Sequence, residues 1–427
     1  MDQLDIFELM YDKVKIQKPI RLIEFFAGYG SQALALKYLG ANFEHWKIAE
    51  WNYKSSFAYK SIHFPDDKTD YSKGLDKSSL VDFLFNKGIS SDWNESMSRT
   101  QIERFPEWEL RRIYNSIIAT HNLVNVSQIR GGDLEIQDQD KYSYILTYSF
   151  PCQDLSLAGL RKGMDQESGT RSSLLWEVKR ILQECYELRT LPDVLLMENV
   201  PQVHGTGNAE NFKLWQLELE KLGYESYWKD LIATDYGIPQ IRNRTFMVSV
   251  KKGNSYKFPK KIKLEKKLKD ALENEVDESY YLSDSMINYI YGNENAGKYN
   301  RLAARESADR CIEKGLAVTL STNMSRPTDN FIKVKNKTKK GYLEAEEGDG
   351  INISNSENDL RIRKLTPTEC FRLMGVKDED SSKLNELSNM VKYHLAGDSI
   401  VTTVLMAIFG ELLDIDWKEK IKEVTKW

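Results

Sequence analysis

Residues 142–159 read YSYILTYSFPCQDLSLAG. The apolar run at residues 144–148 breaks at the sequence SFP and presents Cys152 immediately afterwards. A short run of aromatic and β-branched residues that ends in Ser and Pro is typical of a buried strand entering a loop. Cys152 would then lie just beyond the carboxyl end of a strand, where open α/β sheets place their ligands. The plainer interpretation is a buried, unreactive cysteine.

A glycine turn near the N-terminus follows a similar pattern. The sequence predicts a strand at residues 22–26 and a tight turn at residues 28–30 (GYG). It then predicts a helix at residues 31–39 that ends at Gly40. This arrangement brings main-chain N–H groups and the positive end of a helix dipole to one spot. The turn lacks the third glycine of the dinucleotide-binding motif, so a purely structural turn explains it equally well.

A second predicted strand, at residues 46–49, ends in Glu50 and Trp51. An acidic residue about 20 positions after such a glycine turn is where a ribose hydroxyl is held in dinucleotide-binding folds. Trp51 would cover the face of an adenine. A surface glutamate beside a core tryptophan is the alternative.

A carboxylate follows another buried run. Residues 193–197 are continuously apolar, which predicts a buried parallel strand, and Glu198 comes next. A carboxylate at the exit of a buried strand costs free energy unless it is hydrogen-bonded or takes part in chemistry. We therefore interpret Glu198 as a functional residue.

Two arginines lie between a further pair of predicted strands, residues 224–233 and 245–250, within the segment YGIPQIRNR. The spacing of Arg242 and Arg244 points both guanidinium groups to one side of an extended segment. Ordinary surface arginines are the alternative.

The composition is that of a soluble globular protein. The chain has 427 residues, 41% hydrophobic and 29% charged, which predicts roughly two or three domains. No apolar run reaches about 18 residues, and the acidic N-terminus lacks the features of a signal peptide, so we expect no membrane span. The net charge of −4 does not by itself indicate a nucleic-acid binder.

The cysteines point to a reducing, cytoplasmic setting. They lie far apart, without a CxxC pair or a nearby histidine spacing, at Cys152, Cys185, Cys311 and Cys370. This argues against a zinc site and against a disulfide scaffold, so we predict no metal.

A change in amino-acid composition predicts a second domain at about residues 251–362. Residues 251–269 carry nine lysines and residues 331–340 carry five. Lysine-rich runs are usually solvated surface, but here they would suit contact with phosphates and base edges.

Several other segments have predicted structure. Residues 66–130 form a polar, helix-prone insert with an amphipathic helix at 106–120, and Asp133 would follow at another strand end. Thr366 and Glu369 have the spacing of a capping box that opens a short helix. Residues 395–413 are expected to form a single helix.

Six segments then occur in a fixed order: FAGYG (26–30), PCQ (151–153), ENV (198–200), QIRNR (240–244), RKLTPTECFRLMG (363–375) and GDSIVTTV (397–404). In this order the chain strongly resembles the cytosine-C5 DNA methyltransferases, bacterial and phage enzymes that use S-adenosylmethionine. The resemblance extends from about residue 21 to 405. The lysine-rich segment falls where the family carries its target-recognition domain.

The resemblance implies a fold and a domain order. It implies an α/β fold with a doubly wound, mostly parallel, Rossmann-like sheet and a second, smaller target-recognition domain. Residues 1–250 would form the catalytic domain, 251–362 the target-recognition domain, and 363–427 a return segment that completes the catalytic domain.

The resemblance also implies catalytic roles. Cytosine C5 is a poor nucleophile, and a thiolate that adds to C6 activates it. Cys152 matches the nucleophile of the family, Glu198 the acid at N3 and the exocyclic amine, and Arg244 the arginine at O2, with Arg242 in support. The target base would be flipped out of the duplex. Residues assigned to the DNA or to the closing loop are Ser149, Gln153, Ser156 and Gln240.

The implied cofactor residues are Phe26, Gly28, Gly30, Glu50, Trp51, Asp133, Pro151, Leu174, Asp398 and Ser399. Three positions depart from the family pattern: Glu24 replaces the common Asp, Ser31 a third Gly, and Asp398 the usual Asn. Because Asp for Asn adds charge and removes a donor, we expect altered cofactor or loop contacts rather than loss of activity.

The main hypothesis is thus a cytosine methyltransferase acting on double-stranded DNA, as a monomer, in the bacterial cytoplasm in association with the nucleoid. A cognate restriction endonuclease would fit such a system. A related tRNA cytosine methyltransferase is a second hypothesis, but that branch is expected to carry little recognition domain. An inactive DNA-binding relative is a third, but it should have lost the Cys, the Glu or the arginines.

Overall fold

The computed structural model describes residues 12–92, 94–150, 174–283, 315–322, 331–336, 343–344 and 360–427. The chain divides into two compact units. The first consists of Met1–Leu231, Asn243–Lys260 and Leu405–Trp417, and the second of Ile232–Arg242, Lys261–Val404 and Lys418–Trp427.

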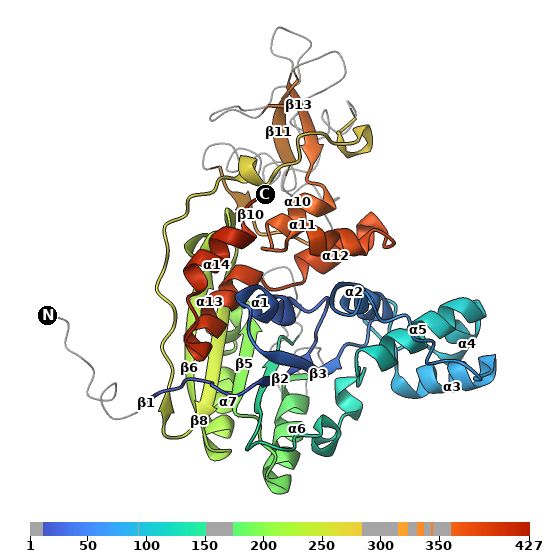
Figure 1. Cartoon of the computed structure of the whole chain (residues 1–427), viewed down its shortest axis with the longest axis vertical. Coiled ribbons are helices and arrows are strands. Elements are labelled where there is room, and N and C mark those ends of the chain that lie inside the picture. The colour runs from blue at the N-terminus through green and yellow to red at the C-terminus, as the bar shows by residue number, and fades with distance from the viewer. Residues whose placement is uncertain are drawn as a thin grey trace, which may run out of the picture. The chain divides into compact units, whose positions relative to one another are not determined.

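A six-stranded sheet forms the centre of the first unit (Figure 1). Its strands, in spatial order, are β3 (Phe43–Ala49), β2 (Ile20–Phe25), β4 (Ser143–Tyr148), β5 (Val194–Asn199), β8 (Asn243–Lys251) and β6 (Tyr224–Ile232). The pairs from β3 to β5 are parallel, and β8 is antiparallel to β5. The predicted α/β fold with a mostly parallel sheet is therefore confirmed.

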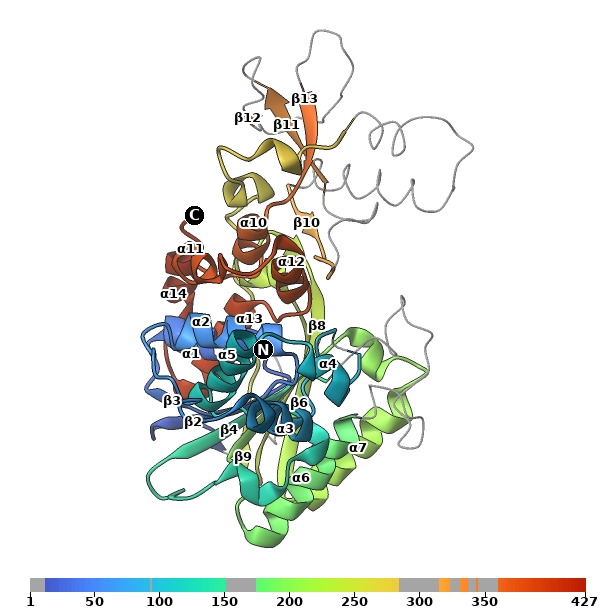
Figure 2. The same ribbon diagram turned by 90° about the vertical axis from the view of Figure 1, so that its right-hand side faces the viewer.

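Two helices cover one face of the sheet. Helices α6 (Leu174–Leu188) and α7 (Ala209–Lys221) lie side by side in Figure 2 and are joined by a 3.0 Å ion pair between Lys179 and Glu218. Alternate residues of β2, β4 and β5 point toward these helices and share one buried core with them. This alternation is what a strand buried on both faces requires.

The opposite face carries α1 (Ser31–Leu39) and the C-terminal part of α13 (Thr402–Leu413) (Figures 1 and 2). Helix α2 (Tyr53–His63) follows β3. The predicted insert is helical and contains α3 (Lys77–Lys87), α4 (Arg99–Glu103) and α5 (Glu107–Ala119), with Pro106 as the N-cap of α5.

Asp133 does not follow a strand, so that prediction was wrong. It lies in a short 3-10 helix, η3 (Gly131–Leu134), where its carboxylate accepts a 2.8 Å hydrogen bond from the N–H of Arg130. The segment forms this 3-10 turn instead of a strand because the Asp133 carboxylate can cap the start of the turn.

The second unit contains short elements. Its described helices include α10 (Pro367–Arg372), α11 (Asp378–Ser381) and α12 (Asn389–Gly397), and α14 spans Trp417–Val424. Strands β11 (Phe331–Asn336), β12 (Leu343–Glu344) and β13 (Leu360–Lys364) form an antiparallel sheet, and β7 (Gln240–Ile241) pairs in parallel with β10 (Ala317–Val318).

Short pieces complete the secondary structure. In the first unit β1 (Asp12–Lys13) pairs in parallel with β9 (Asn254–Ser255). Within the described residues the other 3-10 helices are η2 (Val126–Gln128), η5 (Pro201–His204), η6 (Ala233–Tyr236), η7 (Leu268–Ala271), η8 (Glu278–Tyr280) and η9 (Ser382–Leu384).

The compact units do not follow the expected domain boundaries. Residues 232–242 and 363–404 belong to the second unit, whereas Leu405–Trp417 belongs to the first. Compactness and DNA recognition are different properties, so a target-recognition domain at 251–362 stays a prediction.

The single helix expected at residues 395–413 is two helices. Helix α12 ends at Gly397 and α13 begins at Thr402, with a bend of 42° between them. The helix breaks because the guanidinium group of Arg242 donates to the carbonyls of Gly397 (3.0 Å) and Ser399 (2.7 Å).

Within the described ranges, no single helix is long and apolar enough to cross a membrane. The bent pair α12 and α13 passes that test of length and composition only when the two are taken together. Most of α13 is buried in the protein, as expected of a core helix.

A buried ion pair organises the second unit. Arg363 and Glu369 are both fully buried, and their closest atoms are 2.6 Å apart. Glu369 also accepts the N–H groups of Thr366 and Glu273, each at 2.8 Å, which confirms the capping box at the start of α10. One carboxylate thus joins β13, α10 and the segment at Glu273.

A second buried carboxylate lies in the first unit. Glu24 of β2 accepts hydrogen bonds from the Tyr59 hydroxyl (2.5 Å) and from the N–H of Ala33 in α1 (3.3 Å). Burial raises the pKa of Glu24 to about 7, although both hydrogen bonds oppose this rise. His45, 2.9 Å from the same hydroxyl, has its pKa lowered to about 4 by burial and then by Lys37.

Arg363→Ala should destabilise the second unit by about 3 kcal/mol or more, because it leaves Glu369 buried without its counter-ion. Thermal unfolding and limited proteolysis measure the loss. Lys422→Ala, which removes an exposed pair with Glu419, is the control and should cost less than about 1 kcal/mol. Equal effects of the two substitutions would contradict the ranking.

Glu24→Gln should change how stability depends on pH. The pKa of Glu24 rises from 4.5 to about 7 on folding. The free energy of unfolding of the wild type therefore falls by about 3 kcal/mol as pH rises through this interval. Glutamine cannot ionise, and its amide can serve both the Ala33 N–H and the Tyr59 oxygen. Melting curves of both proteins from pH 5 to 8 should therefore diverge in favour of the variant. Parallel curves would show that Glu24 does not titrate there.

Candidate active site

The glycine turn after β2 has one open side and one packed side. Phe26, Gly28 and Gly30 all have positive φ angles, of 58°, 55° and 83°. A Cβ atom at Gly28 would meet nothing within 4 Å, whereas at Gly30 it would lie 2.4 Å from Nε2 of His63. The turn therefore presents its main chain to open space at Gly28 and is supported from behind at Gly30.

Glu50 connects this turn to the end of β3. One carboxylate oxygen accepts the N–H of Gly28 at 2.9 Å, and the other accepts the N–H of Asn52 at 2.7 Å. The side chain is largely buried, and Trp51 beside it is partly buried. Of the two residues that the sequence assigned to the cofactor here, Glu50 contacts the glycine turn directly.

These residues fit a bound nucleoside cofactor. The open side of Gly28 offers room for close approach to the main chain. Asn52 caps α2 through its Oδ1, whereas its buried Nδ2 has no hydrogen-bond partner. An unused buried donor next to Glu50 is suited to an oxygen of a ligand or of water.

Glu198 lies near the end of β5, and 5% of it is exposed. Its carboxylate accepts a 2.5 Å hydrogen bond from the Ser149 hydroxyl and pairs with Nε of Arg244 at 3.2 Å. Strands β4 and β5 are parallel neighbours, so Ser149 and Glu198 emerge at the same edge of the sheet. Three predicted site residues thus meet around one carboxylate.

Asn199, the next residue, was not assigned a role from the sequence. Its buried Nδ2 donates to the carbonyl of Phe150 at 3.0 Å. The exit of β5 is thereby tied to the chain two residues before Cys152. The segment that carries Pro151, Cys152, Gln153 and Ser156 lies outside the described residues.

The side chains of Arg242 and Gln240 form hydrogen bonds within the second unit. Arg242 is buried and donates to the carbonyls of Gly397 and Ser399, and Gln240 donates to the carbonyl of Leu373 at 2.7 Å. Arg242 thus donates to main-chain carbonyls at the end of α12, whereas Arg244 pairs with Glu198. A catalytic role for Arg242 and a DNA contact for Gln240 stay predictions.

The other predicted cofactor residues have local contacts. Leu174 begins α6 and packs on the core of the first unit. Asp398 is the C-cap of α12, and the Ser399 hydroxyl donates to the carbonyl of Ala396 at 3.1 Å. Both belong to the second unit.

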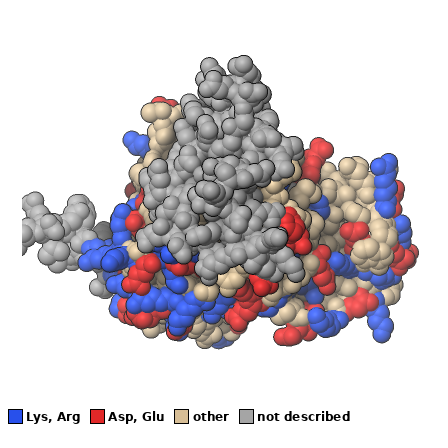
Figure 3. Space-filling model, turned by 90° about the horizontal axis from the view of Figure 1, so that it is seen from above, with Lys and Arg blue, Asp and Glu red and all other residues tan. Residues whose placement is uncertain are grey.

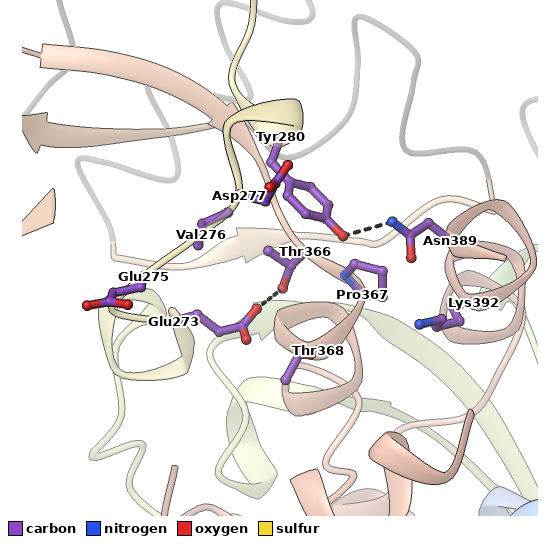
Figure 4. A pocket seen from close by; sticks show the side chains of 10 residues that line it. All are labelled: Glu273, Glu275, Val276, Asp277, Tyr280, Thr366, Pro367, Thr368, Asn389 and Lys392. Carbon is purple, nitrogen blue, oxygen red and sulfur yellow. Dashed lines mark hydrogen bonds between the residues drawn. The ribbon is translucent and has the colours of Figure 1, made fainter. Parts of the chain in front are cut away.

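The second unit also contains a small polar cavity of about 190 Å³ (Figure 4). It is bounded by the chain from Glu273 to Tyr280 and by the first turns of α10 and α12. Of the predicted catalytic and cofactor residues that the structure describes, none lines it. We assign it no role.

Comparison with known proteins places this chain in a family. A family model for C-5 cytosine-specific DNA methylase matches residues 99–414. The Type II methyltransferase M2.ScrFI of Lactococcus lactis subsp. cremoris is 34% identical over 400 residues, covering 92% of this chain and 99% of that protein. The orphan methyltransferase M.SssI of Spiroplasma monobiae is 32% identical over 412 residues, covering 92% and 97%.

Solved structures share the fold. The S. pombe Dnmt2 methyltransferase superposes with a TM-score of 0.57 at 17% identity, covering 93% of this chain and 99% of that chain. The Entamoeba histolytica methyltransferase EhMeth gives 0.53 at 18% identity, with the same coverage. The chain thus belongs to the C-5 cytosine-specific DNA methylases, and is a DNA cytosine methyltransferase with S-adenosylmethionine as its methyl donor.

Proposed function

We propose that the chain methylates C5 of a cytosine flipped out of a short duplex sequence, through a covalent bond between Cys152 and C6. The observation that carries the proposal is the buried carboxylate of Glu198, held between the Ser149 hydroxyl and Arg244. Cys152 follows Ser149 by three residues. A flipped base is required because C6 and N3 are not both accessible in a stacked pair.

In the proposed reaction the thiolate of Cys152 forms a bond to C6. The electron pair of the C5–C6 double bond then becomes available at C5, and Glu198, in its carboxylic-acid form, would transfer its proton to N3 and so neutralise the charge that develops on the ring. Arg244 lies beside Glu198 and would donate to O2 of the base. After methylation, loss of the C5 proton restores the double bond and expels the thiolate from C6.

The cofactor is assigned to the glycine turn of the first unit. Phe26, Gly28 and Gly30 would hold its methionine end, Glu50 its ribose, and Trp51 its adenine. S-adenosylmethionine supplies an electrophilic methyl group when bound. Both oxygens of Glu50 already accept main-chain N–H groups, so a ribose hydroxyl would donate to their remaining lone pairs. Asp133, Pro151, Leu174, Asp398 and Ser399 complete the proposed site.

DNA binding is proposed to rest on local contacts, with target recognition by residues 251–362. In the view of Figure 3, acidic and basic side chains are interspersed over the described surface. The net charge of −4 likewise gives no general attraction to DNA. One relative is named as a Type II enzyme and another as an orphan enzyme, so either setting suits this chain. A monomer on DNA, in the cytoplasm and at the nucleoid, completes the proposal.

Cys152→Ser should abolish methyl transfer while leaving the binding of cofactor and DNA intact, because serine lacks the nucleophilic thiolate. The measurement is methylome sequencing of DNA from a methylation-deficient host that expresses either protein. The wild type should give one short motif with 5-methylcytosine, and the variant none. Unmodified DNA from soluble wild-type protein would contradict the proposal, and transfer of labelled methyl groups to tRNA would then be assayed.

Glu198→Gln should lower kcat about 10²-fold or more while cofactor affinity stays unchanged, because the amide cannot transfer a proton. Single-turnover methylation of a duplex that contains the motif measures the effect. Glu187→Gln, an exposed carboxylate of α6, is the control and should have the wild-type rate. An unchanged rate in the Glu198 variant would remove this residue from the mechanism.

A further inference from the structure

The helical insert returns to the body of the first unit along an edge of its sheet. Strand β3 is the outermost strand, and the chain at residues 121–123 lies beside Ile48. The N–H of Leu123 donates to the carbonyl of Ile48 at 2.8 Å, and the N–H of Ile48 donates to that of His121 at 3.4 Å. The insert therefore covers part of an otherwise open strand edge.

The side chain of Asn122 forms hydrogen bonds with the main chain of Glu50. Its Oδ1 accepts the N–H of Glu50 at 3.0 Å, and its Nδ2 donates to the carbonyl of Glu50 at 2.8 Å. Asn122 is 4% exposed. A single amide side chain thus satisfies both main-chain groups of the residue whose carboxylate holds the Gly28 N–H.

A second point of the insert holds the next residues. The N–H of Ser90 donates to the carbonyl of Trp51 at 2.8 Å, and the carbonyl of Ser90 accepts the N–H of Tyr53 at 3.1 Å. Ser90 and Asn52 are both fully buried. The chain from Glu50 to Tyr53 is therefore fastened at two places by residues that lie more than 30 positions away in the sequence.

The backbone around Asn122 is strained. His121 and Val124 have φ angles of 50° and 71°. A β-branched residue with positive φ is a true outlier, and such strain persists only where the surroundings enforce it. Part of that enforcement is visible, because the N–H of Val124 donates to Oδ1 of Asn122 at 2.8 Å.

We propose that the insert at residues 66–130 belongs to the cofactor-binding apparatus, with Asn122 as a positioning residue for Glu50 and Trp51. This inference rests on the cofactor assignment made under the proposed function. By fixing the main chain of Glu50, Asn122 fixes the carboxylate that holds Gly28 and the ring of Trp51. Cofactor then binds to a preformed segment, without the cost of ordering it.

The test is the dissociation constant of S-adenosylmethionine for the full chain, measured by isothermal titration calorimetry without DNA. Asn122→Ala should weaken binding about tenfold, because two buried hydrogen bonds to Glu50 are lost. Asn122→Asp keeps the shape but loses the donor, and should weaken binding in the same direction. The kcat at saturating cofactor should change much less than the affinity.

Ser116→Ala is the matched control. Ser116 is fully buried in α5 and its hydroxyl donates to the carbonyl of Ser56 in α2 at 2.9 Å, so it joins the insert to the same body without touching Glu50. It should lower the melting temperature but leave the dissociation constant unchanged. Equal effects of the Ser116 and Asn122 variants on affinity would overturn the positioning role. So would loss of the folded state in both Asn122 variants.

Glu50→Ala separates this inference from the cofactor assignment. If it leaves the dissociation constant unchanged, the segment does not bind cofactor and the assignment itself fails. If it weakens binding while both folded Asn122 variants bind normally, the cofactor site stands and only the role of the insert is rejected.

Discussion

A carboxylate buried at the end of a strand must find partners, and the side chains around Glu198 are arranged to meet that requirement. Glu198 is enclosed at the edge of the sheet, where an unpaired charge would be costly. The parallel neighbour β4 supplies the hydroxyl of Ser149, and the antiparallel neighbour β8 supplies the guanidinium of Arg244. Strand order therefore decides which side chains can meet this carboxylate.

The glycine turn of the first unit is supported in successive layers. The Gly28–Gly30 turn is held by Glu50, and Glu50 is held by Asn122 of the insert. Behind the turn, Tyr59 bonds Glu24 and His63 lies 3.0 Å from the carbonyl of Tyr29. Glu50, Asn122 and Tyr59 are buried, so a change in one of them is expected to reach the turn through packed contacts rather than through solvent.

The second unit uses buried arginines as supports for main chain. Arg363 is paired with Glu369, whereas Arg242 donates to carbonyls that a continuous helix would otherwise have used. Guanidinium groups suit this task because they carry several donors in one plane. Arg242 and Arg363, which lie in the segments QIRNR and RKLTPTECFRLMG, therefore both have structural contacts.

Local patterns in the sequence were sufficient for the strands, the glycine turn, the capping box at Thr366 and the order of motifs that indicates the family. These features depend on residues close together in the chain, where alternation and turn chemistry act directly. The continuous helix at 395–413 and the strand end at Asp133 were wrong, because distant or competing hydrogen bonds decided those segments. The roles of Asn122, Tyr59 and His63 had no signal in the sequence. Their partners lie in other segments, and only the folded chain brings a buried amide to both main-chain groups of Glu50.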